Sequence, residues 1–102
     1  MTETGAAYED AVDQDGTVED TDRVRFLARH LAAAADALDR GVPLEGVFVW
    51  SLLDNFEWEE GYGRRFGLVR VDFGTRERTV KLSARWYREL IRAARERQPA
   101  AL

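Results

Sequence analysis

The chain has 102 residues, the length of one small domain, and its 45% hydrophobic and 33% charged residues favour a folded chain over a disordered one. There is no cysteine, which excludes disulfides, a thiolate nucleophile and cysteine-based zinc sites. No apolar run approaches the about 18 residues of a membrane-spanning helix, and no signal peptide is recognisable. We therefore expect a cytoplasmic location and no membrane partner.

The formal net charge of −4 conceals an uneven distribution of charged residues. Residues 1–22 contain eight acidic residues and no lysine or arginine, whereas residues 76–97 contain eight basic residues and three acidic ones. A basic segment can bind nucleic acid, but a solvated helix face gives the same pattern. We favour the solvated face and predict no nucleic-acid partner.

The first half of the chain predicts one long helix, from Asp20 or Thr21 to Arg40. Either residue can cap its start, because a side-chain oxygen there accepts a bond from a free backbone N–H. Gly41 supplies the left-handed residue that ends many helices, and Pro43 prevents continuation. Apolar residues recur at three- and four-residue spacing, which predicts one buried stripe. The stripe consists of Val24, Leu27, Leu31, Ala34 or Ala35, and Leu38.

No metal site is predicted. Asp13, Asp15, Gly16 and Asp22 loosely match a calcium-binding loop, but Ala11 stands where the first ligand should be. His30 is the single histidine; it lies beside the apolar stripe and far in sequence from a second ligand. We interpret it as a helix-surface residue rather than a catalytic one.

The second half of the chain predicts a strand, a long loop, a hairpin and a second helix. Residues 46–50 form a continuous apolar run, which is typical of a parallel strand buried on both faces. Residues 52–67 form a loop rich in aromatic and acidic residues, residues 67–73 pair with 77–80, and a helix covers 83–97. Its apolar face comprises Trp86, Tyr87, Leu90, Ile91 and Ala94. This order indicates α/β units, but so few strands leave open edges, so we expect the chain to be part of something larger.

The stretch from Trp50 to Tyr62 combines aromatic and acidic side chains directly after the predicted strand. Sugar-binding sites need this mixture, because an indole packs on the apolar face of a sugar ring and carboxylates accept hydrogen bonds from its hydroxyls. Core tryptophans beside surface acids would give the same composition. The residue types alone leave these two interpretations evenly balanced.

The order of residues in four segments is more specific than their composition. Residues 46–66, 67–73 and 78–84 read GVFVWSLLDNFEWEEGYGRRF, GLVRVDF and RTVKLSA, and residues 5–8 read GAAY. These segments resemble glycoside hydrolase family 1 of the β-glucosidase type, over nearly the whole chain. The resemblance implies an α/β fold, a TIM (β/α)8 barrel. Residues 1–102 would form its C-terminal quarter: the end of strand seven, helix seven, strand eight and helix eight.

The resemblance also implies the roles of site residues. Glu3 matches the catalytic nucleophile, and Trp50 matches the platform under the sugar that is cleaved off. Glu57 matches a carboxylate that binds sugar hydroxyls, Trp58 a neighbour that donates its indole N–H, and Phe66 an aromatic wall. The Glu57–Trp58 pair favours a non-phosphorylated sugar. The implied substrate is a β-glucoside or a related saccharide, and no cofactor is implied.

Two departures from the family pattern concern catalysis. Thr4 stands where the family has asparagine beside the nucleophile, and the Asn-Glu-Pro motif of the general acid/base is absent from the sequence. A barrel of this type needs about 250 residues. The chain also begins inside the family's strand seven, which favours an incomplete gene product. We therefore expect the isolated chain to lack glycosidase activity.

Two other interpretations stay open. The chain could be a non-catalytic carbohydrate-binding piece, or it could complete a barrel with a separately encoded N-terminal part. Binding of glucose without turnover would support the first, and activity restored by co-expression would support the second.

Overall fold

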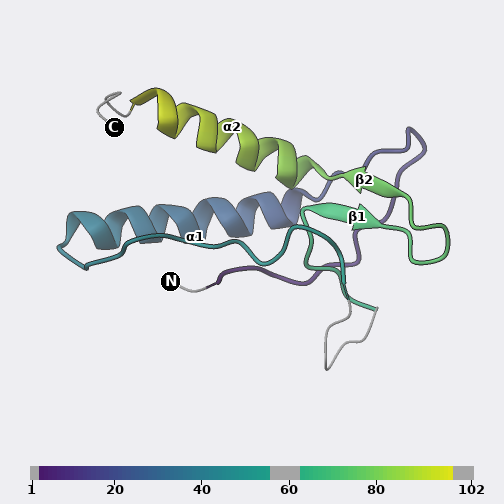
Figure 1. The fold of residues 1–102 in the computed structure, drawn as a ribbon, viewed down its shortest axis with the longest axis horizontal. Helices are drawn as coiled ribbons and strands as arrows, with labels where there is room; N and C mark the ends of the chain where they lie inside the picture. The colour runs from purple at the N-terminus through teal and green to yellow at the C-terminus, as the bar shows by residue number, and fades with distance from the viewer. Residues whose placement is uncertain (1–2, 56–62, 98–102) are drawn as a thin grey trace.

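The computed structural model describes residues 3–55 and 63–97. In chain order these residues form helix α1 (Thr21–Asp39), strands β1 (Val69–Val71) and β2 (Arg78–Val80), and helix α2 (Leu82–Arg97). Figure 1 shows that both helices begin at the end of the molecule where the two strands lie and run from there in the same direction. The helices pack against each other, and none in the described residues is long and apolar enough to cross a membrane.

Helix α1 begins and ends within one residue of the predicted bounds. Its C-terminus is closed by Gly41, whose φ of 91° places it in the left-handed region. Gly41 N–H donates to the Leu38 carbonyl at 3.0 Å, and Val42 N–H donates to the Ala37 carbonyl at 3.0 Å. This bond pattern satisfies carbonyls that have no partner within the helix. The predicted helix stop at Gly41 is therefore confirmed.

The predicted side-chain cap at the start of α1 is wrong. Asp20 stands at the cap position, but its carboxylate makes no capping hydrogen bond to α1. It accepts instead from the backbone N–H of Ser83 at 2.8 Å, and from the hydroxyl of the same residue. Ser83 lies in the first turn of α2, where free N–H groups favour a negative charge. Asp20 therefore joins the starts of both helices.

The apolar faces of the two helices are covered unequally. Leu27 and Ala34 of α1 are buried as the stripe predicts, but Leu38 is 50% exposed. In the described part of α2 the buried residue is Ser83, and the predicted apolar face stays partly exposed, including Leu90 and Ile91. The two helices diverge towards their C-terminal ends in the view of Figure 1, so neither covers the far end of the other.

The prediction of a strand buried on both faces at residues 46–50 is also wrong. Its β pairing is a single parallel bridge between Thr4 and Val49. Phe48 is 69% exposed and Trp50 is 42% exposed. A parallel strand becomes buried on both faces only when paired neighbours and covering helices surround it. One bridge does not supply that environment, so alternate side chains face solvent.

The predicted hairpin is present, with shorter strands. Strands β1 and β2 are antiparallel, and Val69 lies opposite Val80. Within the connection, Asp72 Oδ1 accepts hydrogen bonds from Gly74 N–H at 2.9 Å and from Thr75 N–H at 3.1 Å. The backbone N–H groups of Thr75 and Gly74 hold the pKa of Asp72 below its ordinary value. The Asp72 side chain therefore stabilises the turn between the two strands.

The centre of the molecule is more polar than apolar. In the part of the chain that the structure describes, the buried hydrophobic residues are Val18, Leu27, Ala34, Leu68 and Val71. The buried polar or charged residues are Thr4, Asp10, Asp20, Arg23, Ser51, Asp54, Lys81 and Ser83. Moving an ion from water into the interior costs roughly several kcal/mol per ion. Buried charges of this kind therefore need partners of opposite charge. Those partners organise the site described next.

Candidate functional site

The predicted site residues lie on segments that the backbone holds together. Trp50 N–H donates to the Thr4 carbonyl at 2.8 Å, and Thr4 N–H donates to the Phe48 carbonyl at 2.9 Å, so the Glu3 segment runs beside the Trp50 segment. Ser51 N–H donates to the Phe66 carbonyl at 3.2 Å. The structure therefore brings together the three segments that carry Glu3, Trp50 and Phe66.

The side chains of this site are accessible. Glu3 and Trp50 are exposed, and Phe66 is half-buried. A carboxylate and aromatic surfaces thus meet solvent on neighbouring segments, as a sugar site requires. The other two predicted residues, Glu57 and Trp58, lie outside the described residues.

Gly5 permits the close approach of the first two segments. A Cβ built at Gly5 would collide with the backbone carbonyl of Trp50, whose carbonyl carbon would be only 3.1 Å away. A larger residue would therefore push the Glu3 segment away from Trp50. Gly67 has the same role on the other side, because a Cβ there would lie 2.6 Å from the carbonyl carbon of Leu53.

Below these segments lies a buried ionic network in which carboxylates and cationic groups alternate. Its members in order are Asp20, Arg23, Asp10, Lys81, Asp54 and Arg65. Neighbouring members are joined by N–O distances of 2.6 to 2.8 Å. Three negative and three positive groups balance each other, which removes the main objection to burying charge. The network was not predicted from the sequence.

Lys81 occupies the middle of the ionic network and is 0% exposed. Its Nζ donates to Asp10 Oδ2 at 2.6 Å, to Asp54 Oδ1 at 2.8 Å and to the Gly67 carbonyl at 2.7 Å. An ammonium group has three protons, so each proton has an acceptor.

Asp54 has the largest set of donors in the ionic network. Besides Lys81, it accepts from Arg65 Nη1 at 2.7 Å, from Gly67 N–H at 3.0 Å and from Val71 N–H at 3.2 Å. Burial raises the pKa of Asp54, but hydrogen bonds from Lys81 and Arg65 lower it further than burial raises it. The net result is a pKa below the ordinary value, so Asp54 is a carboxylate at neutral pH.

Arg23 links the network to the first helix. Its Nη1 lies 2.7 Å from Asp10 and 2.6 Å from Asp20, and its Nη2 donates to the Arg65 carbonyl at 2.7 Å. The guanidinium also lies 5.1 Å from the centre of the Tyr8 ring. A signal in the sequence could have revealed this residue, because Arg23 falls on the same helix stripe as Leu27. A charge at a buried position implies a partner.

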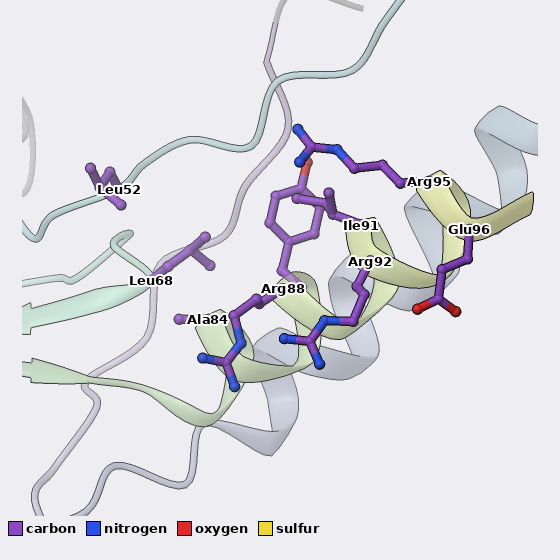
Figure 2. A pocket seen from close by; sticks show the side chains of 9 residues that line it. Leu52, Leu68, Ala84, Arg88, Ile91, Arg92, Arg95 and Glu96 are labelled. Carbon is purple, nitrogen blue, oxygen red and sulfur yellow. The ribbon is translucent and has the colours of Figure 1, made fainter. Parts of the chain in front are cut away.

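An apolar hollow among the described residues lies elsewhere. Figure 2 shows Leu52 and Leu68 on one side and side chains of α2 on the other. The space that these residues line has a volume of about 560 Å³. The lining residues are Leu52, Leu68, Ala84, Tyr87, Arg88, Ile91, Arg92, Arg95 and Glu96. We call this space the α2 groove. Its lining includes none of the predicted sugar-site residues that the structure describes, Glu3, Trp50 and Phe66.

The residues considered for metal binding or general catalysis have other contacts. His30 is exposed on α1 and stacks on Phe26 with ring centres 3.8 Å apart, which confirms its prediction as a helix-surface residue. The Asp13 carboxylate accepts from the Thr17 hydroxyl and from the backbone N–H groups of Thr17 and Asp15. These bonds, led by the Thr17 hydroxyl, lower the pKa of Asp13. Within residues 3–55 and 63–97 no cluster of His, Asp and Glu has metal-binding geometry.

Comparison with known proteins identifies relatives of this chain. The profile described as "Glycosyl hydrolase family 1" matches residues 1–96. Beta-glucosidase A from Thermotoga maritima is 52% identical over 92 residues, which are 90% of this chain and 21% of that protein. A 6-phospho-beta-galactosidase from Staphylococcus epidermidis is 46% identical over 91 residues, which are 88% of this chain and 19% of that protein.

Solved structures agree with the sequence comparison. The family 1 β-glucosidase from Thermotoga maritima in complex with isofagomine lactam matches with a TM-score of 0.88 at 52% identity. The match covers 90% of this chain and 21% of that one. The chain thus spans about a fifth of the length of the relatives it matches.

Proposed function

The chain belongs to glycosyl hydrolase family 1, and we propose that it carries the nucleophile and part of the sugar site of a retaining β-glucosidase-type enzyme. The solved relatives imply a TIM barrel, and the chain aligns to a small part of it. We assign it to the end of strand seven, helix seven, strand eight and helix eight. The parallel bridge between Thr4 and Val49 supports this assignment, because neighbouring barrel strands are parallel and each precedes a helix.

The observation that carries the proposal is the backbone pairing of the Glu3 segment with the Trp50 segment. A retaining glycosidase uses two carboxyl groups about 5–5.5 Å apart. One attacks the anomeric carbon, while the other protonates the leaving oxygen and later removes a proton from water. Glu3 is exposed, and its segment pairs with the segment that carries the exposed indole of Trp50, which suits the attacking role.

The second carboxyl group must come from other residues. The Asn-Glu-Pro motif is absent from these 102 residues, and we propose that the isolated chain therefore lacks glycosidase activity. Thr4 replaces the family asparagine, and its backbone is used in the pairing with Phe48 and Trp50. Asparagine has a side-chain amide, whereas Thr4 has a hydroxyl. We propose that Glu3 therefore has one amide donor fewer than the matching glutamate of relatives that have asparagine.

The proposed substrate is a non-phosphorylated β-glucoside or a related saccharide. The Glu57–Trp58 pair supports this choice. Overall similarity does not distinguish the alternatives, because a β-glucosidase and a 6-phospho-β-galactosidase match at 52% and 46% identity. Comparing hydrolysis of 4-nitrophenyl β-glucoside with that of its 6-phosphate tests this choice in a hybrid enzyme, in which this chain replaces the matching segment of the Thermotoga relative.

A hybrid enzyme tests the nucleophile assignment. In Beta-glucosidase A from Thermotoga maritima, the segment aligned with this chain is replaced by the chain itself. We expect the hybrid to hydrolyse 4-nitrophenyl β-glucoside, and we expect Glu3→Gln to lower kcat by roughly 10³-fold or more, because the attacking carboxylate is lost. Glu9→Gln is the matched control, since Glu9 is another exposed acid of the same segment.

Two results would contradict the proposal. The nucleophile assignment is wrong if the hybrid is active and Glu3→Gln retains full turnover. The expectation for the isolated chain is wrong if the purified 102 residues hydrolyse the same substrate and Glu3→Gln removes that activity.

A second candidate role is completion of a barrel by association with a separate N-terminal part. The α2 groove and the exposed side chains of Phe48 and Leu52 favour it, because contiguous apolar surface is unusual on an isolated domain. Co-expression with the preceding part of the Thermotoga relative should then give a co-purifying, active complex. Tight binding of glucose by the isolated chain without activity in the complex would favour a carbohydrate-binding role instead.

A further inference from the structure

We propose that Lys81 is a positioning residue that holds the Glu3, Trp50 and Phe66 segments in one arrangement. This inference rests on the proposed function, because it concerns the geometry of the proposed sugar site. Lys81 itself lies in the buried interior and does not contact a sugar.

Each ammonium proton of Lys81 goes to a different one of these segments. Asp10 follows the Glu3 segment, Asp54 follows the Trp50 segment, and the Gly67 carbonyl follows Phe66 directly. The acceptors are far apart in sequence, since Lys81 is 71 residues from Asp10 and 27 from Asp54. A single cation therefore fixes the relative positions of three chain segments.

The path from each acceptor to the proposed site is short and hydrogen-bonded. Between Glu3 and Asp10, Tyr8 exchanges two backbone hydrogen bonds with Arg65, at 3.0 and 2.9 Å. Between Trp50 and Asp54, Ser51 N–H donates to the Phe66 carbonyl, and Leu68 N–H donates to the Ser51 carbonyl at 2.9 Å. A displacement of any acceptor would thus be transmitted to the residues that face the sugar.

The backbone of Lys81 is fixed as firmly as its side chain. Its N–H donates to the Leu68 carbonyl at 3.0 Å, and the next residue, Leu82, donates to the Val18 carbonyl at 2.9 Å. Lys81 also lies immediately before α2, which starts at Leu82. The cation is therefore anchored between the hairpin and the second helix.

The side-chain type matters because of the geometry of the donors. An ammonium directs three protons away from one nitrogen, which matches three acceptors around a point. A guanidinium spreads its donors in one plane and needs more room. An apolar side chain would leave the carboxylates of Asp10 and Asp54 with one cationic partner each, Arg23 and Arg65 respectively.

Nuclear magnetic resonance of the full 102-residue chain tests the arrangement directly. Lys81 is the only lysine in the sequence, so labelling lysine with ¹⁵N at Nζ gives one side-chain ammonium signal. We expect this signal to persist at neutral pH, with nuclear Overhauser contacts to the segments of Asp10, Asp54 and Gly67. In the control Arg40→Lys the added ammonium is exposed and should exchange too fast to be seen. A missing Lys81 signal, or contacts to one segment alone, would overturn the proposal.

The variant Lys81→Met separates positioning from general stabilisation. We expect it to shift the amide signals of Glu3, Trp50 and Phe66 together, while signals from the last turn of α1 stay in place. Arg40→Met, which removes an exposed ion pair, should shift none of the three. If Lys81→Met does not fold, Asp54→Asn is measured, and it should shift the Trp50 and ammonium signals. Unchanged site signals in the variant that folds would overturn the proposal.

Kinetics of the hybrid enzyme complete the test. Lys81→Met should lower kcat/KM by about 10²-fold in hybrid that circular dichroism shows to be folded, because small displacements of catalytic groups are that costly. Full activity of this variant would overturn the positioning role. An inactive parent hybrid would instead count against the proposed function, and the ammonium spectrum of the chain would still decide whether Lys81 connects the three segments.

Discussion

At the residue scale, the buried ionic network determines how strongly single substitutions in the interior affect stability. Lys81 and Asp54 are both fully buried, and their side chains lie 2.8 Å apart. Such pairs add little net stability compared with apolar packing, but removing one partner leaves an uncompensated charge in the interior. The network therefore makes the fold sensitive to single substitutions at its centre.

The first prediction concerns the stability of the chain. Lys81→Met should lower the free energy of unfolding by about 3–5 kcal/mol, because Asp10 and Asp54 lose their shared partner. Arg40→Met should change it by about 0–1 kcal/mol, since the Arg40–Asp36 pair is exposed. Urea unfolding followed by circular dichroism measures both values, and similar losses in the two variants would contradict the prediction.

The second prediction concerns pH. The pKa of Asp54 is lower in the folded chain than its ordinary value, because hydrogen bonds from Lys81 and Arg65 outweigh the effect of burial. Its stabilising contribution is therefore complete above the unfolded pKa, about 3.9, and is lost as pH falls through the folded pKa. Urea unfolding from pH 7 down to pH 3 should show a weaker acid dependence in Asp54→Asn than in the parent chain. An unchanged acid dependence would count against this assignment.

At the scale of elements, the contact between the Glu3 and Trp50 segments depends on a glycine. Gly5 faces the Trp50 carbonyl so closely that a Cβ would collide with it. The start of α2 depends in a similar way on a distant group, because the Asp20 carboxylate accepts from Ser83. Both contacts join parts of the chain that are far apart in sequence, so the periodicity of neighbouring residues does not predict them.

The third prediction uses two glycines. Gly5→Ala should destabilise the chain by about 1–3 kcal/mol, because the added methyl group overpacks the contact with Trp50. Gly46→Ala is the matched control, since a Cβ there would meet no atom of the described residues within 4 Å, and its effect should stay within about 0.5 kcal/mol. Thermal unfolding of the two variants decides the matter, and equal midpoints would disprove the role of Gly5.

At the scale of the whole molecule, the chain is more extended than an ordinary domain. Its radius of gyration is 15.3 Å, whereas about 13 Å is typical of 100 residues. The α2 groove and the exposed Phe48, Leu52 and Val80 leave apolar surface in contact with solvent. Under the proposed function, the remainder of a barrel covers this surface.

The fourth prediction tests whether the remainder of a barrel covers the α2 groove. Introducing charge into the α2 groove by Leu52→Glu together with Ile91→Glu should prevent co-purification with the N-terminal part of the Thermotoga relative, because charged groups resist burial. Ala33→Glu, at an exposed position of α1 outside the groove, should leave co-purification unchanged. Equal yields of complex from the two variants would show that the groove is not the interface.

Local sequence signals were sufficient for several features. The bounds of α1, its end at Gly41, the hairpin and the surface position of His30 follow from patterns of neighbouring residues, since capping, turns and helix faces depend on residues a few positions apart. The family resemblance likewise follows from contiguous motifs and agrees with the profile match over residues 1–96.

Long-range pairing required the folded chain. The burial of Lys81 between Asp10 and Asp54, and the shift of Asp20 from the cap of α1 to the start of α2, connect residues up to 71 positions apart. Such contacts have no period in the sequence, so an isolated lysine and three aspartates look like ordinary surface residues. The predicted burial of residues 46–50 was wrong for a related reason: Phe48 is 69% exposed, because the burial of a strand depends on which neighbours surround it and not on its own residues alone.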